Sequence, residues 1–417
     1  MVFKEASSSS HTLPMTDGDS TAPLLGHLTG DHLSSQPKTF ANVFIAIVGA
    51  GVLGLPYAFK RTGWAAGSLM LFFIGALTYH CMMLLVRTRR RLEEDGGFSK
   101  LVSFGDLGLA VAGRGGRLAV DLMIILSQSG FCVGYLIFIS NTLTHILPRS
   151  PNKFLSLAAI LPFQLALNSI RSLTVLAPLS IFADIVDIAA MAVVLGVDFA
   201  AFARHQPDLI AFGGPSVVLY GLGVAVYAFE GIGMVLPLES EAANKANFGR
   251  TLGLSMAAIS AIYAAFGSFG YMAFGEETRD IITTNLGAGL IPIVVQIGLC
   301  INLFFTLPIM MNPVYEVAER WTCGKRYCMW LRWGLVMAVS LITLLVPNFT
   351  DFLSLVGNSV CCILGFVLPA AFHLRVFGAE MGWIGIASDL GIIVVGVVFA
   401  VSGTYSTVME IFFSARV

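Results

Sequence analysis

Two short stretches of the chain combine glycine and proline in a way that could bind a small ligand through the backbone. The first, Gly49-Ala-Gly-Val-Leu-Gly-Leu-Pro56, lies in an apolar run from Phe40 to Phe59, which is long enough to cross a bilayer. Glycine has high backbone entropy and proline lacks an amide donor, so the sequence predicts a break in this helix. In hydrocarbon, a broken backbone is tolerated only where it is buried in protein or lines a cavity.

The second stretch, Tyr227 to Pro237, has the same order of Gly-x-Gly followed by proline, and it also contains Glu230. It falls five apolar spans after the first. Because five is odd, its helix would enter the membrane from the opposite side, as an inverted repeat requires. Paired interruptions at corresponding positions of two halves point to a transporter substrate site.

Each break should offer two kinds of backbone group. A helix that starts there exposes amides, and a helix that stops there exposes carbonyls. An amino acid suits both, with its carboxylate on the amides of Gly49 to Gly51 and its ammonium on the carbonyls that end the first halves. The predicted substrate site in the two breaks is Ile47, Val48, Gly49, Ala50, Gly51, Tyr227, Ala228, Phe229 and Gly231.

Ionisable side chains inside apolar spans are costly and therefore candidates for function. Glu230 could bind a proton, pair with the ammonium, or order the unwound turn. Asp184, Asp187 and Asp198 share one face of a helix at about 100° per residue. They could form a proton relay, or serve structurally through Arg171 or interhelical hydrogen bonds. We predict proton coupling through Glu230, Asp184 and Asp187.

Other functions fit the sequence less well. Gly49 to Gly54 matches Gly-x-Gly-x-x-Gly, but the run from Gly63 to Val86 lacks the acidic residue that a dinucleotide site needs. A plain kinked helix packed through small residues is the simpler alternative. No hydrolase or metalloprotease motif supports an enzyme, and Cys323 and Cys328 are too isolated for a zinc site. We therefore expect no cofactor and no metal.

Composition defines the class of protein. Hydrophobic residues make up 56% of the chain and charged residues 12%, with a mean hydropathy of +0.83. These values predict an all-α polytopic membrane protein whose surroundings are the lipid bilayer. The formal net charge is −1, and the sequence has no cluster of basic residues that could bind nucleic acid.

Eleven apolar spans can be read from the chain. They are 40–59, 63–86, 118–143, 154–170, 173–202, 217–238, 252–274, 291–314, 333–346, 352–372 and 390–412. The fourth and ninth are the shortest. We expect a disordered cytosolic tail over 1–38, five-helix repeats over 39–203 and 204–375, and an eleventh helix with a lumenal C-terminus over 376–417. Lys and Arg gather in loops on the side of the N-terminus, which places that end in the cytosol.

Three motifs together resemble the amino acid/auxin permease family, most closely its plant and fungal vacuolar neutral amino acid exporters. They are Gly49-Ala-Gly-Val-Leu-Gly-Leu-Pro56-Tyr-Ala-Phe59, Cys132-Val-Gly-Tyr135-Leu-Ile-Phe138 and Ala228-Phe-Glu-Gly231. The resemblance implies a 5+5 inverted-repeat fold of the LeuT type with spans one and six unwound, a proton gradient as the driving force, and Tyr135 closing over the substrate. Asn42 stands where animal lysosomal members have a histidine, so coupling would use other residues.

The expected function is proton-coupled export of neutral L-amino acids from the vacuole to the cytosol by alternating access. The expected protein is a monomer in a vacuolar or lysosome-like membrane. The sequence leaves symport or antiport open. Leu24 and Leu25 resemble a dileucine sorting signal. An alternative is an amino acid sensor that signals through its N-terminal tail.

Overall fold

The computed structural model of this 417-residue chain describes residues 33–95, 101–146, 152–171, 177–204, 207–214, 217–287 and 289–413. Regular secondary structure in these ranges is helical, apart from an isolated bridge between Ser34 and Ala242. Residues 1–32, with the predicted dileucine signal, lie outside the described part of the chain.

Every apolar span expected from the sequence contains helix. In chain order the helices are α1 (Gln36–Ile47), η1 (Ala50–Gly54), α2 (Leu55–Thr62), α3 (Trp64–Glu94), α4 (Phe104–Ile146), α5 (Lys153–Asn168), α6 (Ala177–Arg204), α7 (Val218–Ala228), η4 (Ile232–Met234), α8 (Val235–Glu241), α9 (Phe248–Phe274), η5 (Gly275–Glu277), η6 (Ile282–Asn285), α10 (Leu290–Thr322), α11 (Met329–Leu345), α12 (Phe349–Val356), α13 (Leu368–Phe377), α14 (Trp383–Val398) and α15 (Thr404–Phe413). Short π-helical segments, η7 (Gly357–Cys361), η8 (Ile363–Val367) and η9 (Phe399–Gly403), continue α12 into α13 and α14 into α15.

Length and composition show how many helices could cross a membrane. Eight helical segments among the described residues pass this test, and α1 with η1 and α2, bent by 52°, makes a ninth. Helices α5 and α11 are apolar but have only 16 and 17 residues. They correspond to the fourth and ninth expected spans, so the count of eleven depends on both of them crossing as well.

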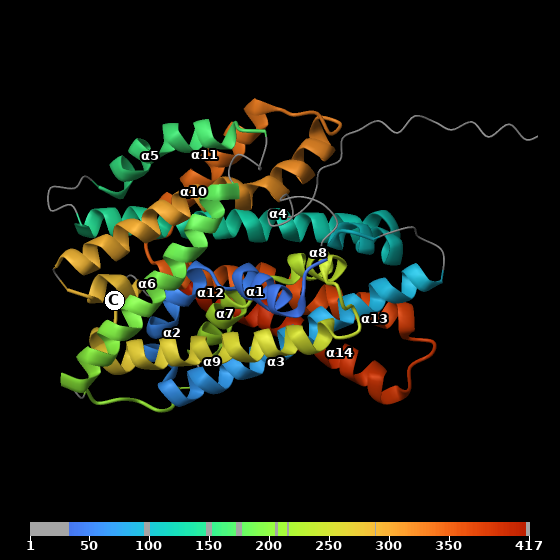
Figure 1. Ribbon diagram of the computed structural model, residues 1–417, viewed down its shortest axis with the longest axis horizontal. Helices are drawn as coiled ribbons and strands as arrows, with labels where there is room; N and C mark the ends of the chain where they lie inside the picture. The colour runs from blue at the N-terminus through green and yellow to red at the C-terminus, as the bar shows by residue number, and fades with distance from the viewer. Residues whose placement is uncertain are drawn as a thin grey trace, which may run out of the picture.

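The broken helices occupy the middle of the molecule. Figure 1 shows α1, α7 and α12 at the centre, with α4 and α10 along one side and α3 and α9 along the other. Helix α7 contacts α12, α2 contacts α9, and α6 packs against both α9 and α10. Helices α5 and α11 contact each other and lie beyond α10 in this view. The breaks are therefore surrounded by protein, as the cost of unpaired backbone in hydrocarbon requires.

The outer surface of the bundle is apolar. Large side chains such as Leu69, Leu290 and Ile384 are 64%, 78% and 68% exposed. Polar side chains such as Ser255 and Gln296 are instead buried, and each donates to a backbone carbonyl. Apolar residues outside and satisfied polar residues inside are what a lipid environment favours.

Two boundaries differ from the sequence-based expectation. Helix α4 begins at Phe104, well before Leu118, and its first part is separated by a kink at Gly113, where φ is 65°. Asp106 before the kink, and Arg114 and Arg117 after it, interrupt the apolar pattern ahead of Leu118, so apolar runs could not reveal this start. The N-terminal segment expected to be disordered to residue 38 is already helical at Gln36. The proposed boundaries of the two repeats remain predictions.

Candidate substrate site

The first break interrupts the helix over two extended residues. Helix α1 ends at Ile47, and Val48 and Gly49 are extended, with φ/ψ of −75°/118° and −154°/−164°. A 3₁₀ turn then leads into α2, where Pro56 occupies the first turn and its missing amide costs no hydrogen bond. The amides of Ala50 and Gly51 begin this turn and have no acceptor within it. In the described chain they make no backbone bond outside the helices either.

The second break repeats this order. Helix α7 ends at Ala228, Gly231 is non-helical with φ/ψ of 179°/8°, and a 3₁₀ turn leads into α8, which contains Pro237. The sequence therefore predicted both interruptions at the correct residues.

The two broken helices run antiparallel. The end of α2 meets the residues before α7, since the Gly213 amide donates to Thr62 O at 2.6 Å. The residues before α1 meet the end of α8, where the Ser34 amide donates to Glu241 O at 2.8 Å. The first halves of the two helices thus enter the bundle from opposite ends. We call these the Lys60 end, where α2 finishes, and the arginine end, where α3 finishes with Arg87, Arg89, Arg90 and Arg91.

Glycines let the two breaks touch. A Cβ on Gly51 would lie 3.0 Å from the Cα of Ala228, and a Cβ on Gly231 would lie 2.8 Å from Ile47 Cγ1. In contrast, a Cβ on Gly49 would meet nothing within 4 Å. The missing side chain of Gly51 thus serves close packing of the breaks here, whereas free space remains beside Gly49.

A tyrosine that the sequence analysis did not select bridges the breaks. Tyr263 on α9 is 0% exposed. Its hydroxyl lies 3.3 Å from Ile47 O and 3.2 Å from Ala228 O. These carbonyls end the first halves of both broken helices, where the sequence predicted that an ammonium would bind. One hydroxyl has a single proton for two acceptors, so a group with more donors could satisfy these carbonyls better.

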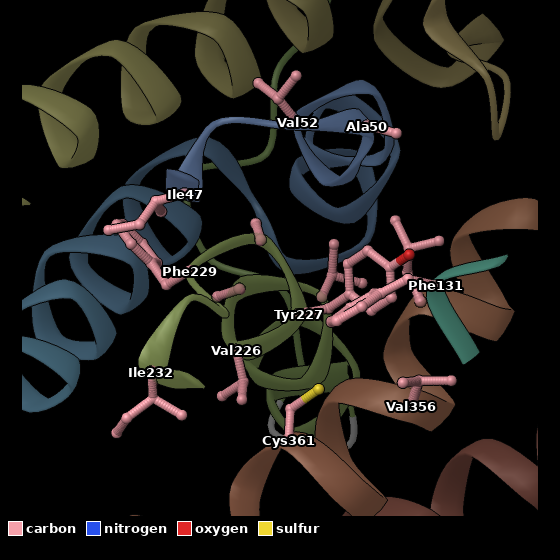
Figure 2. Close-up of a cluster of buried hydrophobic side chains, with 14 of the residues drawn as sticks. Ile47, Ala50, Val52, Phe131, Val226, Tyr227, Phe229, Ile232, Val356 and Cys361 are labelled. Atoms are coloured by element: carbon pink, nitrogen blue, oxygen red, sulfur yellow. The ribbon is translucent and has the colours of Figure 1, made fainter. Parts of the chain in front are cut away.

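Aromatic side chains line the other side of the second break. The rings of Tyr227 and Phe131 meet edge to face with centroids 4.7 Å apart, and Figure 2 shows Val356 and Cys361 nearby. The Tyr227 hydroxyl is buried without a hydrogen-bond partner among the described residues. Tyr135 is 8% exposed, and a Cβ on its neighbour Gly134 would lie 3.0 Å from the Tyr227 hydroxyl. The structure thus places α4 near Tyr135 beside the second break, and the closing of Tyr135 over the substrate stays a prediction.

The three predicted proton-coupling residues differ in position. Glu230 lies in the second break, and its Oε1 is buried without a hydrogen-bond partner in the described chain. Asp187 lines a small cavity between α1 and α6 together with Phe44 and Val48. Asp187 is therefore beside the first break. The side chain of Asp184 lies outside the described residues.

The second half of each broken helix is anchored at its far end by a side-chain contact to a neighbouring segment. At the arginine end, Glu239 of α8 is 0% exposed and pairs with Arg89 and Arg90 of α3. At the Lys60 end, the Lys60 amine of α2 donates to Glu276 O at 2.5 Å. Ala50, Tyr227 and Ala228 are all 5% exposed or less. These three residues of the breaks are therefore shielded from solvent in this structure.

The comparison with protein families shows which family this chain belongs to. Residues 32–409 match the family described as transmembrane amino acid transporter protein. The chain belongs to this family. The family predicted from the three motifs is confirmed, and so is the expectation of a transporter and not an enzyme.

Curated relatives resemble this transporter along its length. It is 61% identical to "Amino acid transporter AVT3C" and 60% identical to "Amino acid transporter AVT3A", both of Arabidopsis thaliana, over 98% of each chain. It is 26% identical to "Vacuolar amino acid transporter 3" of Schizosaccharomyces pombe, over 90% of this chain and 58% of that protein.

Solved structures show the same fold at low identity. The transporter resembles Mhp1, a nucleobase-cation-symport-1 family transporter, in a closed conformation with bromovinylhydantoin bound. The TM-score is 0.53 and the identity 15%, over 91% of this chain and 92% of that chain. For inward-facing Mhp1 the values are 0.56 and 13%, over 90% of each chain. The fold class is thus that of a helical LeuT-like transporter.

Proposed function

We propose that this transporter moves neutral amino acids from the vacuole to the cytosol, driven by protons. The observation that carries the substrate assignment is the meeting of two antiparallel broken helices. One break supplies the free amides of Ala50 and Gly51, and both supply carbonyls, at Ile47 and Ala228. These are the partners that a carboxylate and an ammonium need.

The walls of the site favour an uncharged substrate side chain. Phe131, Tyr135, Tyr227 and Cys361 surround the second break and carry no charge at neutral pH. A charged substrate side chain would have to give up its hydration among these groups, which is costly unless a partner is present. Small or apolar side chains avoid this cost.

Glu230 is the proposed coupling carboxyl. Its buried, unpartnered Oε1 makes the ionised form costly when the site is closed and empty. A bound ammonium nearby would favour the ionised form. Substrate and proton would therefore affect each other's binding through one residue, and that effect must be reciprocal.

The relatives and the charge distribution support the proposed address and orientation. A fission yeast relative carries the name of a vacuolar transporter. Four arginines end α3, and the excess of basic residues at this end would face the cytosol. The N-terminus would then be cytosolic and, with eleven spans, the C-terminus lumenal. We propose a monomer with the 5+5 arrangement over 39–203 and 204–375.

Purified protein in proteoliposomes tests this function. We expect uptake of radiolabelled neutral amino acids that increases when the side of entry is acidified. The Glu230→Gln variant should lose this acid stimulation and keep slow exchange, because glutamine cannot titrate. Glu277→Gln, at an exposed glutamate, is the matched control and should behave as the wild type does. Wild-type protein that accumulates no amino acid under any gradient would refute the proposal, and a wild-type pH profile in Glu230→Gln would exclude Glu230.

A further inference from the structure

A fully buried carboxyl of α6 lies where α6 packs against α9, next to Pro56 in the first turn of α2. Asp198 is 0% exposed, and neither carboxyl oxygen has a hydrogen-bond partner in the described chain. A Cβ on Gly270 of α9 would lie 3.3 Å from Asp198 Oδ2 and 2.6 Å from Pro56 Cγ of α2. The carboxyl therefore sits at a junction of three helices, one of which is half of the first broken helix.

No charged group interacts with this carboxyl in the described chain. On α2, Lys60 donates instead to the carbonyls of Glu276 and Thr278, and Arg61 stacks on Tyr220. On α9, the Tyr271 hydroxyl accepts from the Ile210 amide. The other titratable groups on the elements packed against α6, and on α6 itself, are Tyr57, Asp184, Asp187, Arg204, Arg250, Tyr263, Cys300, Tyr315, Glu316, Glu319 and Arg320.

Such a junction strongly disfavours an ionised carboxylate. Burying a charge without a partner costs several kcal/mol, and the alternatives are to bind a proton or to open the packing to water. The acid form of Asp198 is neutral and can stay among α2, α6 and α9. The closed packing at the Lys60 end therefore requires a protonated Asp198.

We propose that Asp198 is a second proton-binding site of this transporter, and that its proton holds α2 and α6 together at the Lys60 end. The inference rests on the proposed proton-coupled function and adds a residue and a conformational consequence to it. Loss of the proton would charge the junction, separate α6 from α2 and α9, and favour opening at that end. Proton binding and closing are then linked, because the proton binds the closed state better.

Hydrogen exchange of the α2 amides, Leu55 to Thr62, measures this opening directly. The comparison is between wild type and Asp198→Asn at the same pH, so that intrinsic exchange rates cancel. A single-proton linkage changes the ratio of open to closed states by up to about tenfold per pH unit. We therefore expect wild-type α2 to lose protection relative to Asp198→Asn by up to about this factor per pH unit as pH rises.

A matched variant separates the junction from general effects of charge. Asp208 lies in the segment after α6, near the same end, but it is exposed. Asp208→Asn should therefore show the pH dependence of the wild type. Equal α2 exchange in wild type and Asp198→Asn at every pH would overturn the proposal.

Infrared spectroscopy of the wild type covers the case in which Asp198→Asn does not fold. With isotope-labelled aspartate, a protonated buried carboxyl gives its own C=O stretch. We expect this band to persist at neutral pH, where exposed aspartates are ionised. Its absence at neutral pH would also overturn the proposal.

Failure of this inference can be distinguished from failure of the proposed function. If wild-type uptake is acid-stimulated but Asp198→Asn leaves α2 exchange unchanged, Asp198 is not the site and proton coupling stands. If hydrogen exchange of α2 changes with pH as predicted but amino acid uptake does not depend on pH, Asp198 binds a proton that does not drive transport.

Discussion

Replacing Tyr263 with phenylalanine removes a single oxygen from the contact between the two breaks. That hydroxyl lies 3.3 Å from Ile47 O and 3.2 Å from Ala228 O, and its single proton is shared between these two acceptors. A buried acceptor that loses its partner costs about 1–3 kcal/mol. This destabilises the empty closed state, whereas in the loaded state the substrate ammonium can satisfy both carbonyls.

This difference has a kinetic consequence. A transporter must return empty through its closed state during net uptake, but during exchange it returns loaded. At about 1.4 kcal/mol per factor of ten, Tyr263→Phe should slow net uptake by about 5- to 150-fold and leave exchange close to wild type. Both rates can be measured in proteoliposomes with the same radiolabelled amino acid.

Tyr271→Phe is the matched control for Tyr263→Phe. Tyr271 is also a fully buried tyrosine of α9, but its hydroxyl contacts Ile210 and not the breaks. It should affect net uptake and exchange equally, if at all. Net uptake and exchange that fall together in Tyr263→Phe would refute the assignment of this hydroxyl to the ammonium position.

Three other changes have defined outcomes. Gly51→Val should abolish uptake at normal abundance because a Cβ there meets backbone at 3.0 Å; overpacking of this kind costs about 1–3 kcal/mol or more, and normal uptake kinetics would contradict the close contact. Glu239→Gln leaves the buried Arg89 with only the more distant carboxylate of Glu93, at 3.9 Å, so in thermal unfolding it should destabilise the protein by up to about 3–5 kcal/mol. Loss of the exposed pair between Arg91 and Glu380 should cost about 1 kcal/mol or less. Changing Leu24-Leu25 to Ala-Ala should send part of the protein to the cell surface, as fluorescence microscopy of a tagged chain would show.

The sequence allowed the broken helices to be predicted because two local signals coincide in them. Glycine and proline within an apolar run of spanning length have few structural solutions in a membrane. Apolar length alone located helix in each expected span, whereas the count of eleven membrane crossings stays a prediction. The start of α4 at Phe104 could not be found this way, since its charged residues resemble a loop in an apolar profile.

The residues that connect distant segments were harder to predict. Tyr263 lies in an apolar part of α9, and only packing shows that its hydroxyl reaches both breaks. The sequence placed Asp198 on one face with Asp184 and Asp187, but not against Pro56 and Gly270. Spacing along one helix specifies a face but does not specify which helix covers that face.

The central claim is that both breaks together bind the amino and carboxyl groups of one amino acid. The most direct test is competition for uptake in proteoliposomes between a radiolabelled neutral amino acid and three unlabelled compounds. These are the same amino acid, its N-acetyl derivative and its methyl ester. We predict that the free amino acid competes and that neither derivative does, because each lacks one of the two charged groups. Equal competition by either derivative would contradict the claim.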